Sequence, residues 1–249
     1  MVEPSVPGED GAGRKLGDVI ARQLEREIVE LGFPAGHVLG SEAELRERLK
    51  ISRAVLREAV RVLEHHGVAT MRRGPGGGLA VTAPETGAVV RASALALAYT
   101  KADPQHVFEA RSALELKCVE LATARIDECG IARLRASLRL EQERQRNGGL
   151  GTHDLHTVLA ELTGNRALVL FVEVLTTLTN THDTHARSPR VAAEVRVAHD
   201  KIAEAVIAGD AALARHRMQT HLIAIGKWLA CPARGGDGAR SDDSVREQE

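Results

Sequence analysis

One short stretch of the chain constrains the fold more than any other, because it predicts two helices joined by a very short link. Ser41 is followed by Glu44 at the spacing of a capping box, which indicates a helix that begins there and runs to about Leu49. Ser52 is a candidate N-cap for a second helix, which ends before Gly67. Two helices joined so closely are typical of a helix-turn-helix.

A β-hairpin pattern follows these two helices directly. The β-prone runs VATMRR and LAVT stand on either side of the glycine cluster GPGGG, as expected for two strands and a tight turn. Upstream of both helices, apolar residues recur at helical spacing from Leu16 to Ile28 and predict one more amphipathic helix. Residues 14–83 therefore predict three helices and a hairpin, the elements of a winged helix-turn-helix domain.

The third of these helices carries a row of arginines. Arg53, Arg57 and Arg61 recur every four residues and so lie on one helix face, and the two arginines of VATMRR add charge beside the glycine turn. Residues 46–73 hold eight basic and three acidic residues, although the whole chain has a net charge of -1. Guanidinium groups on an exposed helix suit the guanine edges and phosphates of a DNA major groove. The alternative is an ordinary solvated helix face.

The runs SEAELRERLKISRAVLREAVRVLEHHGV and RRGPGGGLAV, within residues 16–83, resemble the winged helix-turn-helix of GntR-type transcription regulators. In that family the recognition helix opens with a hydroxyl residue and an arginine, here Ser52 and Arg53, and a second arginine falls on Arg57. Ala43 stands where the family usually has an arginine, which removes one base or phosphate contact. The resemblance and the charge pattern together give these candidate DNA-binding residues: Ser52, Arg53, Arg57, Arg61, Arg72, Arg73, Gly74 and Gly76.

The rest of the chain has a different texture. Residues 93–230 follow helical patterns almost throughout, and an antiparallel all-α bundle is their natural packing. Residues 84–92 are expected to be a linker, and the glycine-rich, charged ends, 1–13 and 231–249, are expected to be disordered. The predicted fold class is mainly α: an N-terminal winged helix-turn-helix with a β-hairpin wing, and a C-terminal antiparallel helical bundle.

Three histidines occupy unusual positions in the predicted bundle. His156, His199 and His221 each lie on or beside the apolar stripe of a different helix, so all three can point into one interior. Neutral imidazoles that are buried together are good ligands for zinc or another divalent metal ion. For any one of them the alternative is a hydrogen-bonded core histidine.

The segments HTVLAELTGNRAL and AHDKIAEAVIAGDAALARHRMQTHL resemble the C-terminal effector domain of the FadR-type branch of the same family, and ARSALELKCVELA resembles its first long helix. In members that bind a metal, the ligands are an aspartate four residues before a histidine and two later histidines. The histidines correspond to His156, His199 and His221, but the aspartate position is Thr152. His153 lies three residues before His156 and is the nearest substitute.

This resemblance also implies a small-molecule effector. Pockets of that family bind small carboxylic acids, often with the metal polarising the carboxylate, and other members bind acyl-CoA. The candidate effector-binding residues are Arg111, Thr152 and His153, with Arg111 as a second anionic anchor. The alternative role for Arg111 is a surface salt bridge with Glu109 or Glu115.

Composition excludes several other classes of protein. Aromatic residues make up only 2% of the chain, which excludes a surface that stacks single-stranded bases. The three cysteines form no CxxC pair, so a disulfide framework is not supported and a reducing cytoplasm is predicted. No apolar run reaches the roughly 18 residues of a membrane-spanning helix, so no membrane partner is expected.

The predicted function is a ligand-responsive, homodimeric regulator of transcription. We expect it to bind palindromic double-stranded operator DNA and to act as a repressor that a small carboxylate or acyl-type effector releases. An enzyme is not expected, because the chain contains neither HExxH nor GxSxG. Two alternatives are a metal-dependent hydrolase that uses the three histidines, and a purely structural helical protein, which leaves the basic winged segment unexplained.

Overall fold

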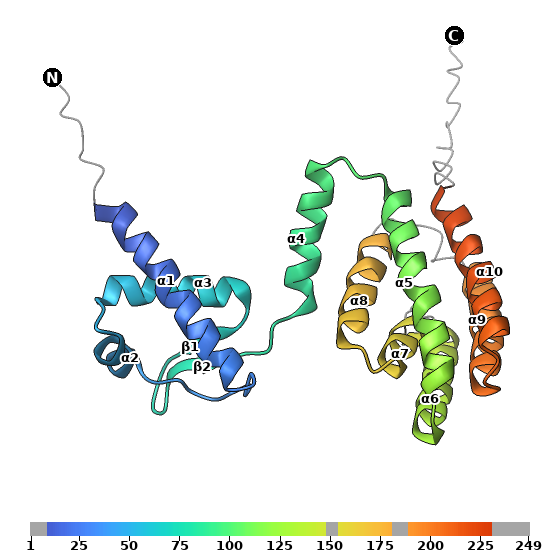
Figure 1. Cartoon of the computed structure of the whole chain (residues 1–249), viewed down its shortest axis with the longest axis horizontal. Helices are drawn as coiled ribbons and strands as arrows, with labels where there is room; N and C mark the ends of the chain where they lie inside the picture. The colour runs from blue at the N-terminus through green and yellow to red at the C-terminus, as the bar shows by residue number, and fades with distance from the viewer. Residues whose placement is uncertain (1–8, 148–153, 181–188, 231–249) are drawn as a thin grey trace, which may run out of the picture. The chain divides into compact units, whose positions relative to one another are not determined.

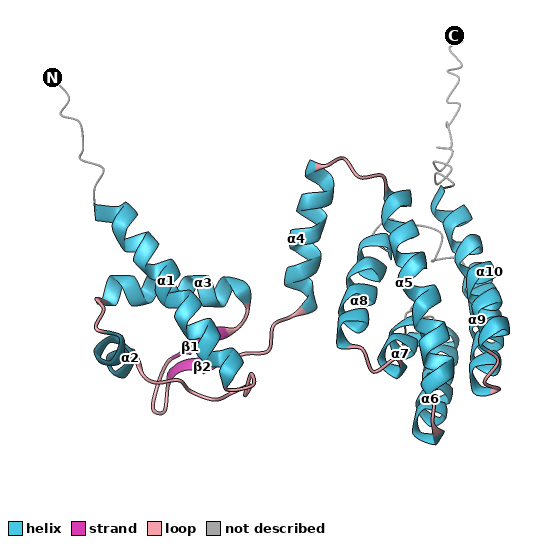
Figure 2. Cartoon of the chain, in the orientation of Figure 1, coloured by secondary structure: helices cyan, strands magenta, loops and turns pink. Residues whose placement is uncertain are grey.

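The computed structural model describes residues 9–147, 154–180 and 189–230 (Figure 1). The chain divides into two compact units, with the boundary between Ala92 and Ser93. Both units are mainly helical, and the β-structure of the described residues lies in the first (Figure 2). This agrees with the predicted fold class.

The first unit consists of three helices and a hairpin. Its elements are α1 (Glu9–Glu30), α2 (Glu42–Leu49), α3 (Arg53–His66), β1 (Ala69–Arg72) and β2 (Gly78–Val81). The capping box is present, since the Ser41 hydroxyl accepts a hydrogen bond from the Glu44 amide and the Glu44 carboxylate accepts one from the Ser41 amide. The link between α2 and α3 turns sharply because Lys50 has a left-handed backbone with φ of 53°.

Strand β2 has a neighbour on each side. It pairs antiparallel with β1, with Ala69 opposite Val81. On its other edge the Leu79 amide donates to the Gly40 carbonyl at 2.9 Å, and the Val81 amide donates to the His37 carbonyl at 2.8 Å. The segment before α2 therefore lies along the second edge of β2, with an isolated antiparallel bridge between Val38 and Ala80. A side chain at Gly78 would put its Cβ 2.4 Å from the Gly40 oxygen, so this close approach requires glycine.

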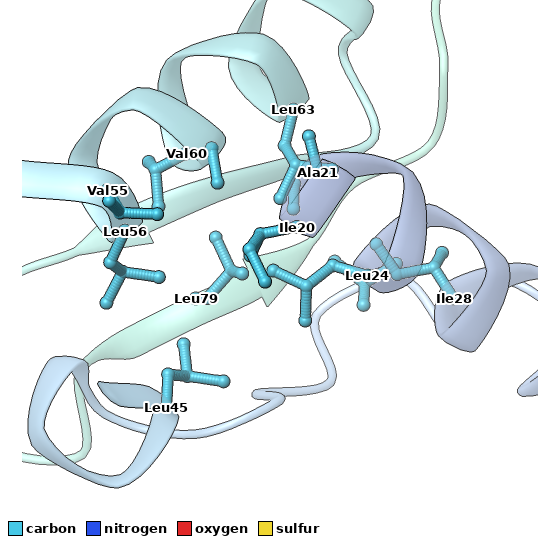
Figure 3. Close-up of a cluster of buried hydrophobic side chains, with 13 residues drawn as sticks. Ile20, Ala21, Leu24, Ile28, Leu45, Val55, Leu56, Val60, Leu63 and Leu79 are labelled. Atoms are coloured by element: carbon cyan, nitrogen blue, oxygen red, sulfur yellow. The ribbon is translucent and has the colours of Figure 1, made fainter. Parts of the chain in front are cut away.

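The core of the first unit lies between α1, α3 and the sheet (Figure 3). Its buried side chains come from all five elements. They include Ile20, Ala21, Leu24, Ile28, Leu45, Val55, Leu56, Ala59, Val60, Leu63, Ala69, Leu79 and Val81. Because α3 packs its apolar face onto this core, its opposite face is left to solvent.

The second unit is an assembly of helices around α5. Its elements are α4 (Thr86–Tyr99), which crosses the boundary between the units, α5 (Pro104–Arg125), α6 (Glu128–Arg146), α7 (Asp154–Leu162), α8 (Arg166–Asn180), α9 (Pro189–Ile207) and α10 (Ala211–Ala230). Helix α5 packs against α7, α8, α9 and α10, and α6 packs against α7 and α9. Figure 1 shows α5 in green with α8 on one side and α10 on the other.

Two segments have a different secondary structure from the one expected. Residues 86–92, expected to be linker, belong to α4, because the sequence from Thr86 to Tyr99 has no proline to interrupt a helix. Residues 9–13, expected to be disordered, extend α1 at its N-terminal end, since a nucleated helix propagates into proline-free residues. The other residues expected to be disordered, 1–8 and 231–249, lie outside the described residues. No described helix is long and apolar enough to cross a membrane.

Candidate functional site: an arginine groove and a three-histidine cluster

Helix α3 presents its predicted arginines to solvent. Ser52 caps the helix, with its hydroxyl 3.3 Å from the Val55 amide, so the serine begins the helix at the residue before Arg53. Arg57 and Arg61 follow on the same exposed face, opposite the buried stripe of α3. The local sequence therefore fixes which face the arginines occupy.

The hairpin completes a groove beside this helix. A hollow of about 840 Å³ is lined by Arg53, Arg57 and Arg61 from α3 and by Arg72 and Arg73 from the hairpin. The structure thus brings together all five arginines that the sequence singles out. The two predicted glycines lie in the hairpin turn: Gly74 lines the groove, and Gly76 is exposed outside it, both with positive φ values of 97° and 73°. We call this feature the arginine groove.

Two glutamates form exposed ion pairs with arginines of the arginine groove. The Nε atom of Arg53 lies 2.8 Å from a Glu42 oxygen, and a terminal nitrogen of Arg61 lies 2.8 Å from a Glu58 oxygen. Exposed pairs of this kind contribute only about 0–1 kcal/mol, so an incoming phosphate can displace them. Arg57 forms no ion pair with any described residue, and its guanidinium is available to a partner.

The three predicted histidines meet in the interior of the second unit. His156 from α7, His199 from α9 and His221 from α10 are each no more than 3% exposed. The Nε2 atom of His221 lies 3.2 Å from Nε2 of His199 and 3.4 Å from Nε2 of His156. All three rings therefore direct the same type of nitrogen at one point, and we call this arrangement the three-histidine cluster.

Two glutamates hold the outer nitrogens of these rings. Nδ1 of His199 lies 2.9 Å from Oε2 of Glu141, which comes from α6. Nδ1 of His156 lies 2.6 Å from Oε2 of Glu115, which comes from α5. A carboxylate at Nδ1 favours the tautomer with hydrogen on Nδ1 and a lone pair on Nε2, the atom that faces the centre of the cluster.

Arg111 lies behind Glu115 rather than on the surface. It is 2% exposed; its Nε donates to Glu115 Oε1 at 2.6 Å, and a terminal nitrogen donates to the Thr179 hydroxyl at 2.9 Å. The pairing with Glu115 that was considered as the alternative role is therefore present, but it is buried and does not lie on the surface. The guanidinium occupies a buried position because Thr179 and Glu115 both accept hydrogen bonds from it.

Burial and neighbouring charges set the protonation of this region. Burial alone would raise the pKa of Glu115, but the charges and hydrogen bonds of His156 and Arg111 outweigh it and hold that pKa well below its usual range. Burial lowers the pKa of His156 despite the opposing effect of Glu115. Burial, reinforced by the other two histidines, also lowers the pKa of His221 well below its usual value. Neutral imidazoles are the form that binds metal ions.

The cluster has the donors and the spacing that a divalent ion needs. A tetrahedral zinc ion with Zn–N bonds of about 2.0–2.1 Å holds two nitrogens about 3.3–3.4 Å apart. The two Nε2 separations from His221, 3.2 and 3.4 Å, match that geometry, and one nitrogen from each of the three rings lies within 4.8 Å of the other two. Among the described residues, these three histidines form the one group of potential ligand side chains close enough to share an ion. The remaining candidates for this site, Thr152 and His153, lie outside the described residues.

Sequence reasoning considered Glu115 only as a possible partner of Arg111 and missed Glu141 entirely, although a signal for a buried role of both was present. Glu115 is buried on α5 with Cys118 and Val119, three and four residues further on. Glu141 continues the buried spacing of Leu134 and Ser137 on α6. A carboxylate on the buried face of a helix requires a polar partner, so such a residue is a candidate member of a site.

Two family descriptions match the sequence. Residues 16–78 match "Bacterial regulatory proteins, gntR family", and residues 106–224 match the FCD domain. The first region contains the arginine groove, and the second contains the three-histidine cluster with both glutamates. Each matched region thus corresponds to one of the two candidate sites.

Several curated proteins are similar over much of the chain. The uncharacterised HTH-type transcriptional regulator YcbG of Bacillus subtilis is 30% identical over 210 residues, which are 82% of this chain and 87% of that protein. The HTH-type transcriptional regulator LutR of the same organism is 27% identical over 75% of this chain and 89% of LutR. The Uxu operon transcriptional regulator of Escherichia coli is 29% identical over 57% of this chain and only 56% of that protein.

One solved structure resembles this chain along most of its length. Streptococcus agalactiae GntR aligns with a TM-score of 0.66 and 22% identity, and the alignment covers 85% of this chain and 99% of the other. At this level of identity the likeness concerns the fold alone.

Proposed function

This chain is a transcriptional regulator of the GntR family with a C-terminal FCD domain, and we propose that it represses transcription until a small carboxylate or acyl-type effector releases it from operator DNA. Regulators of this family bind DNA and are not enzymes, and the hydrolase considered from the three histidines finds no support among the relatives. We propose that the protein acts in the cytoplasm, because its operator DNA is there.

The observation that carries the DNA-binding role is the arginine groove. Helix α3 enters the major groove in this proposal, so that Arg53 and Arg57 reach base edges or phosphates. The hairpin follows the adjacent backbone, where Arg72 and Arg73 neutralise phosphates. Ser52 and the turn glycines support these contacts, as the resemblance to the family implies, and Arg61 adds to them through its place on the same face of α3.

One such module reads few base pairs, so we propose that the protein binds as a homodimer to a palindromic site. Selection from a random pool of double-stranded DNA should enrich an inverted repeat. Light scattering should give twice the chain mass with and without the selected DNA. A monomer under both conditions, or a pool without any enriched sequence, would contradict the proposal.

The contribution of the arginine groove to DNA affinity is tested with two variants. One removes an arginine from the groove, and the control removes an exposed arginine from the second unit. Arg57→Ala should weaken binding to the selected DNA by about 1–3 kcal/mol at fixed salt, because it deletes a base or phosphate contact. Arg139→Ala removes an exposed arginine from α6 and should leave the affinity unchanged. Fluorescence anisotropy with labelled DNA measures both. Equal affinities for the two variants would show that α3 is not the recognition helix.

In the second unit we propose that His156, His199 and His221 hold zinc or another divalent metal ion, which would polarise the carboxylate of the effector. Thr152 and His153 remain candidates for the effector pocket. The Arg111 guanidinium already donates hydrogen bonds to Glu115 and Thr179. It therefore binds the effector directly only if effector binding breaks these bonds; otherwise it acts on the pocket by holding Glu115 in place. The effector binds one state of the dimer more tightly than the other, and it thereby shifts the dimer away from the state that binds DNA. The coupling free energy between the two sites is typically about 1–3 kcal/mol.

A panel of small carboxylates and acyl thioesters, added to the protein–DNA complex, tests the switch. At least one compound should raise the dissociation constant for DNA, and the same compound should stabilise the free protein against heat. Compounds that stabilise the protein without any change in DNA affinity would contradict the proposed release.

A further inference from the structure

The two glutamates of the three-histidine cluster differ in their surroundings. Glu115 shares its carboxylate between the Arg111 guanidinium and His156, so its negative charge is compensated within the protein. Glu141 is just as buried, at 2% exposed, but its one polar contact in the described part of the chain is Nδ1 of His199. Its second oxygen, Oε1, is buried and accepts no hydrogen bond from any described residue. The 2.6 Å contact between Glu115 Oε2 and His156 Nδ1 is likewise close without the alignment of a hydrogen bond, so the two glutamates differ chiefly in the Arg111 guanidinium that only Glu115 contacts.

A buried carboxylate without a cation is unfavourable, and proteins normally pair such groups. A neutral His199 supplies no such charge, but a metal ion held at the point that the three Nε2 atoms face, on the far side of the His199 ring from Glu141, would supply it. The metal-binding pattern of the family supplies a negative charge there through an aspartate, and this chain has Thr152 at that position. Position 152 therefore offers no carboxylate, whereas Glu141 is a buried carboxylate with no arginine or lysine partner among the described residues.

We propose that Glu141 is the residue that orients and charges the metal site of this protein. By accepting the Nδ1 hydrogen of His199, it leaves the Nε2 lone pair aimed at the shared centre and makes that ring a stronger ligand. Its negative charge, placed one imidazole away from the ion, offsets the charge that a threonine at position 152 does not provide. This inference rests on the proposed metal site and names the side chain on which its affinity depends.

Glu115 cannot serve in the same way. The Arg111 guanidinium lies 2.6 Å from its other oxygen, so the pair Arg111–Glu115 brings little net charge to the cluster. Glu115 therefore orients His156, whereas Glu141 both orients His199 and supplies charge. Glu141→Gln should consequently lower metal affinity more than Glu115→Gln does.

The test uses the full-length protein, stripped of metal with a chelator and titrated with zinc against a chromophoric competitor. Glu141→Gln keeps the shape of the side chain and removes its charge, and we expect a loss of about 10–100-fold in zinc affinity. Glu143→Gln makes the same change at an exposed position on the same helix and should bind zinc like the wild type. Melting without metal serves as the structural readout. Glu141→Gln should melt at or above the wild-type temperature without zinc and gain less from its addition.

The outcomes separate the two proposals. A wild type that binds no zinc contradicts the metal site and this inference together. A wild type that binds zinc, with Glu141→Gln as tight as Glu143→Gln, overturns this inference alone. Should Glu141→Gln not fold, imidazole nitrogen spectra of the metal-free wild type decide: hydrogen on Nδ1 of His199 supports the role of Glu141, and hydrogen on Nε2 overturns it.

Discussion

Arg57 and Arg111 are the same residue type in opposite surroundings. Arg57 stands exposed in the arginine groove and makes no ion pair with a described residue, whereas Arg111 is buried and already donates to Glu115 and Thr179. An exposed, uncommitted guanidinium is available to bind a phosphate or a base that arrives from outside. A buried, committed one stabilises the protein that contains it. The comparison teaches that an arginine near a pocket is an anion site only if its donors are free.

The largest expected difference between the two arginines is in their contribution to folding stability. Arg111→Ala should lower the free energy of unfolding by about 3–5 kcal/mol, because it leaves the Glu115 carboxylate buried without its cation. Arg57→Ala should change that free energy by no more than about 0.5 kcal/mol, since it removes only an exposed side chain. Urea denaturation followed by circular dichroism gives both values. Two variants of equal stability would contradict the difference in surroundings.

The next effect concerns stabilisation by metal. Free zinc at 100 times its dissociation constant should stabilise the wild type by about 2.7 kcal/mol, because zinc binds only the folded chain. His199→Ala and His221→Ala each delete one of the three proposed ligands and should abolish most of this gain and lower the bound metal content. His216→Ala, on the exposed face of α10, is the matched control. Thermal melts with and without zinc, together with elemental analysis, measure the change.

The three histidines could be found in the sequence, whereas their carboxylate partners could not. His156, His199 and His221 follow the apolar periodicity of their own helices, and such periodicity is local information. The contacts of Glu115 and Glu141 depend on how α5, α6, α7 and α9 pack together, which no local pattern specifies. The burial of Arg111 was missed for the same reason.

In the first unit, local sequence patterns predicted more of the structure. The capping box at Ser41, the cap at Ser52 and the turn glycines each specify backbone geometry within a few residues, and the structure contains all of them. The bounds of α1 and α4 were less predictable. A helix end that lacks a capping residue or a proline depends on propagation and packing rather than on one local residue.

The smallest expected effect tests the local signal at the start of α3. Ser52→Ala removes the hydroxyl that accepts the Val55 amide and should destabilise the first unit by about 1 kcal/mol. Ser52→Asp restores a cap acceptor and should recover that stability, although the added negative charge should weaken DNA binding beside Arg53. Equilibrium unfolding and DNA titration are both needed. Equal stability of the wild type and the alanine variant would mean that the cap contributes nothing.

The position of β2 between two neighbours has a kinetic consequence. The Leu79 and Val81 amides donate to the segment before α2, and β1 pairs along the other edge, so the wing cannot detach without breaking the sheet. These two amides should then exchange with solvent as slowly as those in the middle of α3, through opening of the whole unit. A wing that is already ordered loses little conformational entropy on meeting DNA. In the proposed DNA complex, the strands of the wing and α3 would therefore approach the operator as a single preformed surface.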